Sequence, residues 1–251
     1  MAKNTWETLR DATDFHISQG EETITDNLLL HLLRQQDPNI RVIKTPKHLE
    51  SQSGTDWEWW IGNINMGYVR YAVQAKKLDE KTHRYSKLNH LTGQIPNQMF
   101  QHDVLRNYAL KNNAIPLYAF YNHINLSSFN QYWNCPLPLE IEQLGITVTP
   151  LKNVKKAIQT WGQRTFECLH QNSDTIPLRC LVKCPHTKNG KGLNGEFDVQ
   201  KFESPIGIYQ ADEISFLRNQ DSSVMESFPA KFYDSEFGIY PKKILVVTRE
   251  S

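Results

Sequence analysis

The sequence contains no long apolar segment and no excess of charge of either sign. Among its 251 residues, 28 Lys and Arg stand against 27 Asp and Glu. No run of about 18 apolar residues occurs, so we expect no membrane span. The first residues lack the apolar core of a secretory signal, which predicts a cytoplasmic protein. Because the charges nearly cancel, any surface that binds nucleic acid must be local.

Cysteine is also scarce, with four residues, all in the second half of the chain. In a cytoplasmic protein these thiols are expected to be reduced and buried. The alternative is a zinc site at Cys180, Cys184 and His186, with Cys168 or His170 as the fourth ligand. This spacing is not one of the familiar zinc-finger spacings, so we favour structural thiols.

The most informative stretch runs from Gly54 to Lys76 and is rich in aromatic and β-branched residues. It is typical of two strands joined by a turn that contains Gly and Asn. Side chains alternate between the faces of a strand, so Asp56 and Glu58 share one face. Gln74 and Lys76 share a face of the second strand for the same reason. If the strands pair as a hairpin, Asp56, Gln74 and Lys76 converge at the sheet surface.

These side chains have the chemistry of a metal site. Carboxylate and amide oxygens are hard ligands that Mg²⁺ accepts, which makes Asp56 and Gln74 candidate ligands of Mg²⁺ or Mn²⁺. The Ala75 carbonyl and the Glu58 carboxylate are further candidates. A lysine at position 76 can orient a water or stabilise negative charge on a phosphate. The alternatives are an edge hairpin with a solvated polar face, and Glu58 as a polar neighbour at a strand end.

Periodicity predicts further elements on both sides of this hairpin. Up to residue 121, their expected order is helix, strand, strand, strand, helix, strand. A helix at 6–15 precedes this set. The elements beside the hairpin are a helix with Ile24, Leu28 and Leu32 at four-residue spacing, a strand at 40–44, a helix at 98–110 and a strand at 115–121. Beyond residue 121 we expect strands at 145–149, 178–183, 206–209 and 243–249, and a helix at 153–169.

The sequence resembles the PD-(D/E)XK nuclease superfamily in two respects. It has an Asp on one strand and Gln-x-Lys on the next, and its elements follow an αβββαβ order. The pattern is most similar to the Mrr-like branch, where Gln replaces an acidic residue. The resemblance covers residues 21–121. It implies an α/β, restriction-endonuclease-like core with a mixed central sheet flanked by helices. Residues 1–121 would form this core with an N-terminal extension. Residues 122–251 would form an α+β extension, either separate or integrated with the same domain.

In this superfamily a glutamate on the first helix often joins the metal site. Glu21 and Glu22 open the corresponding helix here, and the sequence does not say which of them would take that role. The alternative is that Ser18 and Glu21 form a capping box, in which Glu21 serves only the helix N-terminus.

The resemblance implies a Mg²⁺-dependent endonuclease that acts on nucleic acid, with DNA favoured over RNA, in bacterial restriction or anti-phage defence. The alternative is a catalytically inactive nuclease fold that binds nucleic acid or regulates a partner. Homodimerisation and an activating ligand or partner protein stay open. The candidate nucleic-acid contacts near the motif are Lys44, Lys47, Lys77, Arg84 and Gln98.

Overall fold

The computed structural model describes residues 1–44, 55–93, 95–182, 208–214 and 241–249. The predictions made for Lys47, Cys184 and His186 lie outside these ranges. The chain forms two compact units, each assembled from three stretches of sequence. The first unit comprises 1–31, 75–90 and 117–202, and the second comprises 32–74, 91–116 and 203–251. Compact units need not be separately folding domains, so the division at residue 121 stays a prediction.

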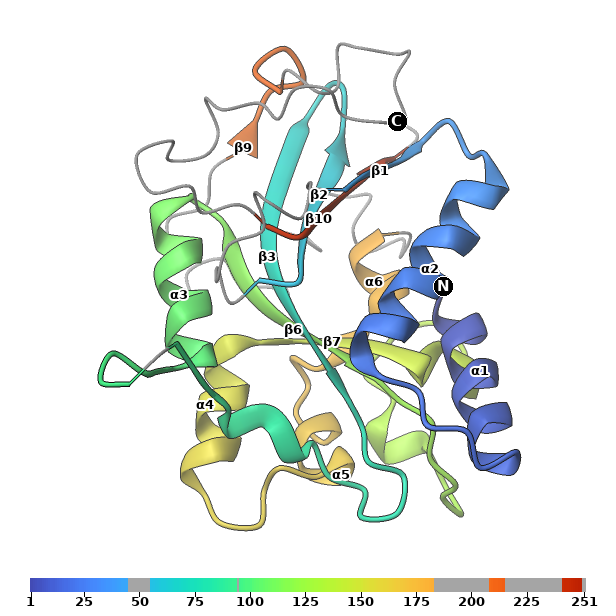
Figure 1. The fold of residues 1–251 in the computed structure, drawn as a ribbon. Helices are drawn as coiled ribbons and strands as arrows, with labels where there is room; N and C mark the ends of the chain where they lie inside the picture. Colours follow the sequence, from blue (N-terminus) through green and yellow to red (C-terminus); the bar gives the residue numbers. More distant parts are fainter. Residues whose placement is uncertain (45–54, 94, 183–207, 215–240, 250–251) are drawn as a thin grey trace. The chain divides into compact units, whose positions relative to one another are not determined.

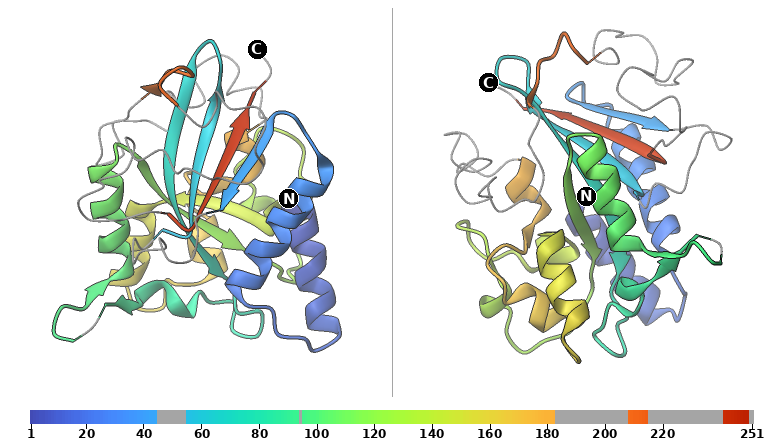
Figure 2. Two further views of the ribbon diagram at one scale, coloured as in Figure 1. Left: turned by 45° about the horizontal axis from the view of Figure 1, so that its top comes forward. Right: turned by 90° about the vertical axis from the view of Figure 1, so that its left-hand side faces the viewer.

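The second unit is built on strands paired in the order β1-β10-β2-β3 (Figure 1). They span Ile40–Lys44, Lys243–Thr248, Trp57–Asn63 and Gly67–Lys77. Strand β10 is antiparallel to β1 and parallel to β2, and β2 and β3 form an antiparallel hairpin. Figure 2 shows β10, drawn in red, between β1 and β2. The C-terminal strand thus separates two strands that are consecutive in sequence, and the sheet is mixed.

The other elements of the second unit are short or helical. They are β4 (Leu91–Thr92), β5 (Met99–Phe100), α3 (Gln101–Lys111) and β9 (Ile208–Tyr209). Strand β4 pairs with β5, and β9 pairs with β3.

The first unit contains strands β6, β7 and β8, which pair antiparallel in that order. Helix α2, strand β3 and strand β6 contribute residues to both units. The helices here are α1 (Ala2–Asp14), α2 (Glu21–Gln35), α4 (Leu151–Gln159), α5 (Phe166–His170) and α6 (Leu178–Val182), with short 3-10 turns at Ser86–Asn89, Asn130–Tyr132 and Ile141–Gly145. The strands are β6 (Ile115–Tyr121), β7 (Ile146–Pro150) and β8 (Ile176–Pro177).

Most of the predicted elements are present, and the prediction of an α/β fold with a mixed sheet is confirmed. The predicted stripe of α2 is buried, with Ile24, Leu28 and Leu32 each at most 3 % exposed. Two predictions beyond residue 121 are wrong. The segment 178–183 was expected as a strand, but Leu178–Val182 is helical, since a short apolar run does not distinguish the two.

The segment 153–169 was expected as one helix but forms two, α4 and α5. The break between them contains Gly162 at a φ of 83° and Trp161, which is 98 % exposed. Helix α4 ends before this glycine, because its C-cap residue Thr160 has extended backbone angles, with φ at −102° and ψ at 122°. Trp161 therefore lies exposed between the two helices and not within the single helix predicted for 153–169.

A buried polar network holds the first unit together around α5. Asn122 accepts a hydrogen bond from the Tyr85 hydroxyl at 2.6 Å and donates one to Thr147 Oγ1 at 3.1 Å. Thr147 Oγ1 lies 2.8 Å from His170 Nε2, and His170 Nδ1 lies 2.8 Å from the Phe166 carbonyl oxygen. A carbonyl oxygen only accepts, so Nδ1 carries the ring proton and donates it. His170 is fully buried as a neutral imidazole.

This histidine should make the protein sensitive to acid. Burial lowers the pKa of His170 from 6.5 to about 4. Between these pH values the unfolded chain binds a proton at this position and the folded protein does not, so stability is lost as the pH falls. We expect His170 alone to lower the free energy of unfolding by about 3 kcal/mol between neutral pH and pH 4.

Urea unfolding of the wild type and of His170→Gln across this pH range measures the effect. Other groups titrate alike in both proteins, so the difference between the two pH profiles isolates His170. The variant should be less stable at neutral pH but should lose stability less steeply on acidification. Parallel profiles would contradict the prediction.

Candidate active site

The β2–β3 hairpin brings the two predicted metal ligands together in the second unit. Its register pairs Trp57 with Val73, and the Asp56 backbone N–H continues the ladder by donating to the Val73 carbonyl at 3.0 Å. Gln74 Nε2 donates a hydrogen bond to Asp56 Oδ2. Gln74 is buried, whereas the Asp56 side chain is 21 % exposed. The side chain that the sequence assigns to a metal is therefore partly accessible to solvent.

A second side chain contacts Asp56 and was not predicted from the sequence. Lys242 Nζ lies 3.3 Å from Asp56 Oδ1. Parallel pairing of β10 with β2 sets Ile244 opposite Glu58, so the residues that precede the two strands become neighbours. Alternation then puts Lys242 on the same face as Asp56. The sequence predicted the final strand, but it carried no signal for the neighbour of that strand.

In the first unit, helix α2 presents Glu21 to Lys76 of strand β3. Glu21 Oε2 lies 3.6 Å from Lys76 Nζ, and Glu21 Oε1 accepts a hydrogen bond from the Lys77 backbone N–H at 3.3 Å. The Lys76 side chain is 5 % exposed and that of Glu21 is 23 % exposed. Glu22 is exposed. Of the two candidate glutamates, it is Glu21 that faces the predicted lysine.

The alternative role of Glu21 in a capping box with Ser18 is wrong. Helix α2 begins at Glu21, and the Ile24 backbone N–H donates to the Gly20 carbonyl at 3.1 Å. The cap position is therefore Gly20, and Ser18 lies outside the helix. The Glu21 side chain is directed to strand β3 instead.

The Gln-x-Lys pattern lies within one continuous strand. Gln74 and Lys76 are two residues apart on β3 and project from one face, whereas Ala75 projects from the other. All three residues are buried. The spacing of the amide and the ammonium along the chain is therefore set by strand geometry, as the sequence predicted.

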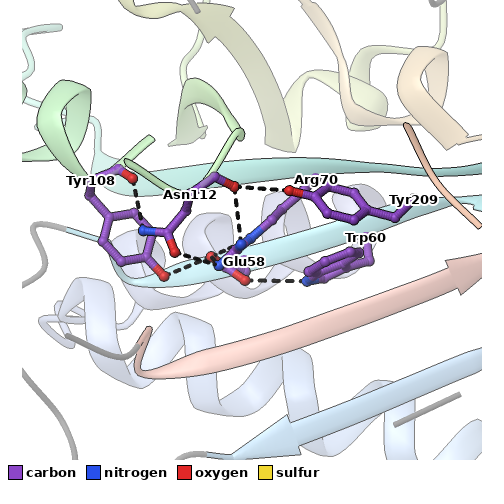
Figure 3. Close-up of polar contacts among 6 residues, drawn as sticks. All are labelled: Glu58, Trp60, Arg70, Tyr108, Asn112 and Tyr209. Carbon is purple, nitrogen blue, oxygen red and sulfur yellow. Dashed lines mark hydrogen bonds and ion pairs between the residues drawn. The ribbon is translucent and has the colours of Figure 1, made fainter. Parts of the chain in front are cut away.

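Glu58 is the centre of a buried ion pair in the second unit (Figure 3). Its Oε1 accepts hydrogen bonds from Arg70 Nη2 at 2.5 Å and from the Tyr108 hydroxyl at 2.7 Å. Its Oε2 accepts one from Trp60 Nε1 at 3.2 Å. Arg70 Nη1 also donates to the Asn112 carbonyl at 3.0 Å. Since both carboxylate oxygens have protein donors, the structure favours a structural role for Glu58 over the predicted role as a metal ligand.

The candidate nucleic-acid contacts do not share one environment. Lys77 and Arg84 are partly exposed in the first unit. Gln98 is exposed but precedes β5, so it is not on the following helix, where the sequence placed it. Lys47 and the side chain of Lys44 lie outside the described part of the chain. Their contacts with nucleic acid stay predictions.

The donor set of the hairpin suits a hydrated magnesium ion. Within the described residues, no group of three or more His, Cys, Asp or Glu side chains could hold a metal. Mg²⁺ usually keeps several waters and needs only one or two protein carboxylates, so Asp56 with the Gln74 amide is a chemically suitable pair.

The thiol predictions hold in part, because Cys180 is buried but Cys168 is exposed.

Residues 1–249 match the sequence pattern of one protein family, which is described as a family of unknown function (DUF6615). The chain belongs to DUF6615. No curated protein and no solved structure matches it. The DUF6615 match spans both units, including the hairpin and the C-terminal strand. In the described part of this DUF6615 chain, no helix is both long enough and apolar enough to cross a bilayer.

Proposed function

We propose that this DUF6615 protein is a Mg²⁺-dependent phosphodiesterase that hydrolyses nucleic acid, with a restriction-endonuclease-like core. The observation that carries the proposal is the direct contact of Asp56 with Gln74 across the hairpin, on the strand that also carries Lys76. The ion pair of Lys76 with Glu21 supports it, because the resemblance expects a helix glutamate at such a site.

The order of elements gives separate support. Helix α2, strands β1, β2 and β3, helix α3 and strand β6 occur in the αβββαβ order of that core, with a 3-10 turn and the short strands β4 and β5 between β3 and α3. Strand β10 is an addition, since it separates β1 from β2. DNA as the favoured substrate, and a role in bacterial restriction or anti-phage defence, rest on the resemblance alone.

In this proposal Asp56 and the Gln74 side-chain oxygen would hold Mg²⁺. The bound ion would offset charge that builds up on the phosphate. The Lys76 ammonium orients the attacking water and stabilises negative charge, while Glu21 holds Lys76 in place. The water oxygen forms the new P–O bond and gives up a proton to solvent, the opposite P–O bond breaks, and the departing oxygen takes up a proton from solvent.

A catalytically inactive binding module is the second candidate, and one observation favours it. The Asp56 carboxylate already has an amide N–H and the Lys242 ammonium beside it. The charge of such a carboxylate is partly neutralised without a metal, as expected of a nuclease fold that has lost catalysis. The two candidates differ in whether a divalent cation binds at Asp56 and supports cleavage.

The test is cleavage of plasmid DNA, single-stranded DNA and RNA by the purified protein, with Mg²⁺, with Mn²⁺ or with EDTA. We expect cleavage of at least one substrate with either cation and none with EDTA, because the negative phosphate requires a counter-charge. Gel electrophoresis and end-labelled products report the reaction. Cleavage that persists in EDTA would contradict the metal mechanism. Binding of nucleic acid without cleavage in all conditions would favour the inactive module.

A further inference from the structure

We propose that Lys242 is part of the active site and alternates between two partners. Without a divalent cation its ammonium neutralises Asp56, and with a cation at Asp56 it binds the scissile phosphate of the substrate. This inference rests on the proposed function and assigns a role to a residue on the C-terminal strand that the nuclease resemblance does not include.

The first step is the contact itself. Lys242 Nζ lies 3.3 Å from Asp56 Oδ1, and Gln74 Nε2 donates to Oδ2 of the same carboxylate. Both oxygens that would bind a cation therefore have N–H donors beside them. A divalent cation and an ammonium repel each other strongly at such distances, so binding of the cation requires Lys242 to withdraw.

The second step is that the side chain can move while the strand stays in place. Strand β10 is held by its pairing with β1 and β2 and by a buried apolar cluster with Ile244, Val246 and Trp60. The Lys242 side chain is 35 % exposed and that of Asp56 is 21 % exposed, so the ion pair is at the surface of this core. A four-carbon lysine stem is flexible enough to move the ammonium by several ångströms.

The third step is the destination of the ammonium. The parallel register begins at Ile244 and Glu58, two residues after Lys242 and Asp56, so the start of β10 keeps the withdrawn ammonium close to any phosphate held at Asp56 by a cation. Lysine binds phosphate as a point charge and needs no fixed geometry. Lys242 would thus add affinity for the substrate only in the metal-bound state.

The test compares metal and DNA binding in the wild type, Lys242→Met and Lys242→Arg. Calorimetric titration with Mn²⁺ should show about tenfold tighter binding to Lys242→Met, because the competing charge is gone. Binding of a DNA duplex in Ca²⁺ should be about tenfold weaker in the same variant, because a phosphate contact is lost. Lys242→Arg keeps the charge and should stay close to the wild type in both measurements.

Lys3→Met is the matched control, since it removes a lysine from an exposed ion pair with Glu7 and should change neither affinity. Thermal unfolding checks that each variant is folded, and Lys242→Gln replaces Lys242→Met if the latter is not. Unchanged Mn²⁺ and DNA binding in the folded variant would overturn the role of Lys242 alone. Equal Mn²⁺ binding by the wild type and Asp56→Asn would overturn the proposed metal site, and the role of Lys242 with it.

Discussion

Replacement of Lys76 by methionine is expected to lower the rate of Mg²⁺-dependent cleavage about a thousandfold and to leave the fold intact. The change removes the ammonium that would orient water and stabilise charge in the proposed mechanism, and the loss of such a group typically costs this much in rate. Methionine keeps an apolar stem in the buried position. Glu21, its partner, is partly solvated and tolerates the loss of the ion pair. Single-turnover cleavage at saturating protein measures the rate.

The two glutamates at the start of α2 provide a matched control for this prediction. Glu21→Gln should slow cleavage because Lys76 loses the carboxylate 3.6 Å from its ammonium. Glu22→Gln removes the same charge from an exposed neighbouring position and should cleave at the wild-type rate. A folded Lys76→Met variant that cleaves normally would refute the assignment of the site to strand β3.

Replacement of Glu58 by leucine is expected to destabilise the protein by about 3–5 kcal/mol. Glu58 and Arg70 have side chains that are 0 % and 2 % exposed, so the variant leaves a buried guanidinium without its counter-charge. Such a loss is a large fraction of the typical stability of a folded domain. Urea unfolding of the wild type and the variant gives the difference in free energy.

The double variant Glu58→Leu with Arg70→Met separates the cost of leaving a charge buried from the cost of changing the packing of the side chains. Because no charge is then left buried, the double variant should be more stable than the sum of the two single changes predicts. Glu7→Leu, which breaks an exposed pair with Lys3, should change stability by less than about 1 kcal/mol. Strict additivity of Glu58→Leu and Arg70→Met would contradict a coupled buried pair.

Local patterns in the sequence predicted the parts of the proposed site that lie close together along the chain. The spacing of Ile24, Leu28 and Leu32 indicated helix α2, and all three residues are buried in it. Alternation along the hairpin predicted that Asp56 and Gln74 lie together, and the amide contact agrees. These predictions succeed because strand and helix periodicity reflect which side chains face the core.

Short or isolated patterns did not carry enough information. The run 178–183 has the length of a strand, but residues 178–182 are helical. Strand alternation predicted that Glu58 shares a face with Asp56 and can bind a metal. Its carboxylate instead accepts hydrogen bonds from Arg70 and Tyr108. Glu58 and Arg70 are on the neighbouring strands β2 and β3, and Tyr108 is on helix α3. No local pattern reports such a combination.

The sequence alone thus determined the α/β character, the motif hairpin and the Gln-x-Lys spacing, because each depends on residues near one another in the chain. The tertiary structure alone decided that Glu21 rather than Glu22 faces Lys76, and that Lys242 contacts Asp56. The second contact arises because β10 pairs in parallel with β2. Pairing of distant strands depends on packing against the rest of the core, which neither strand encodes by itself.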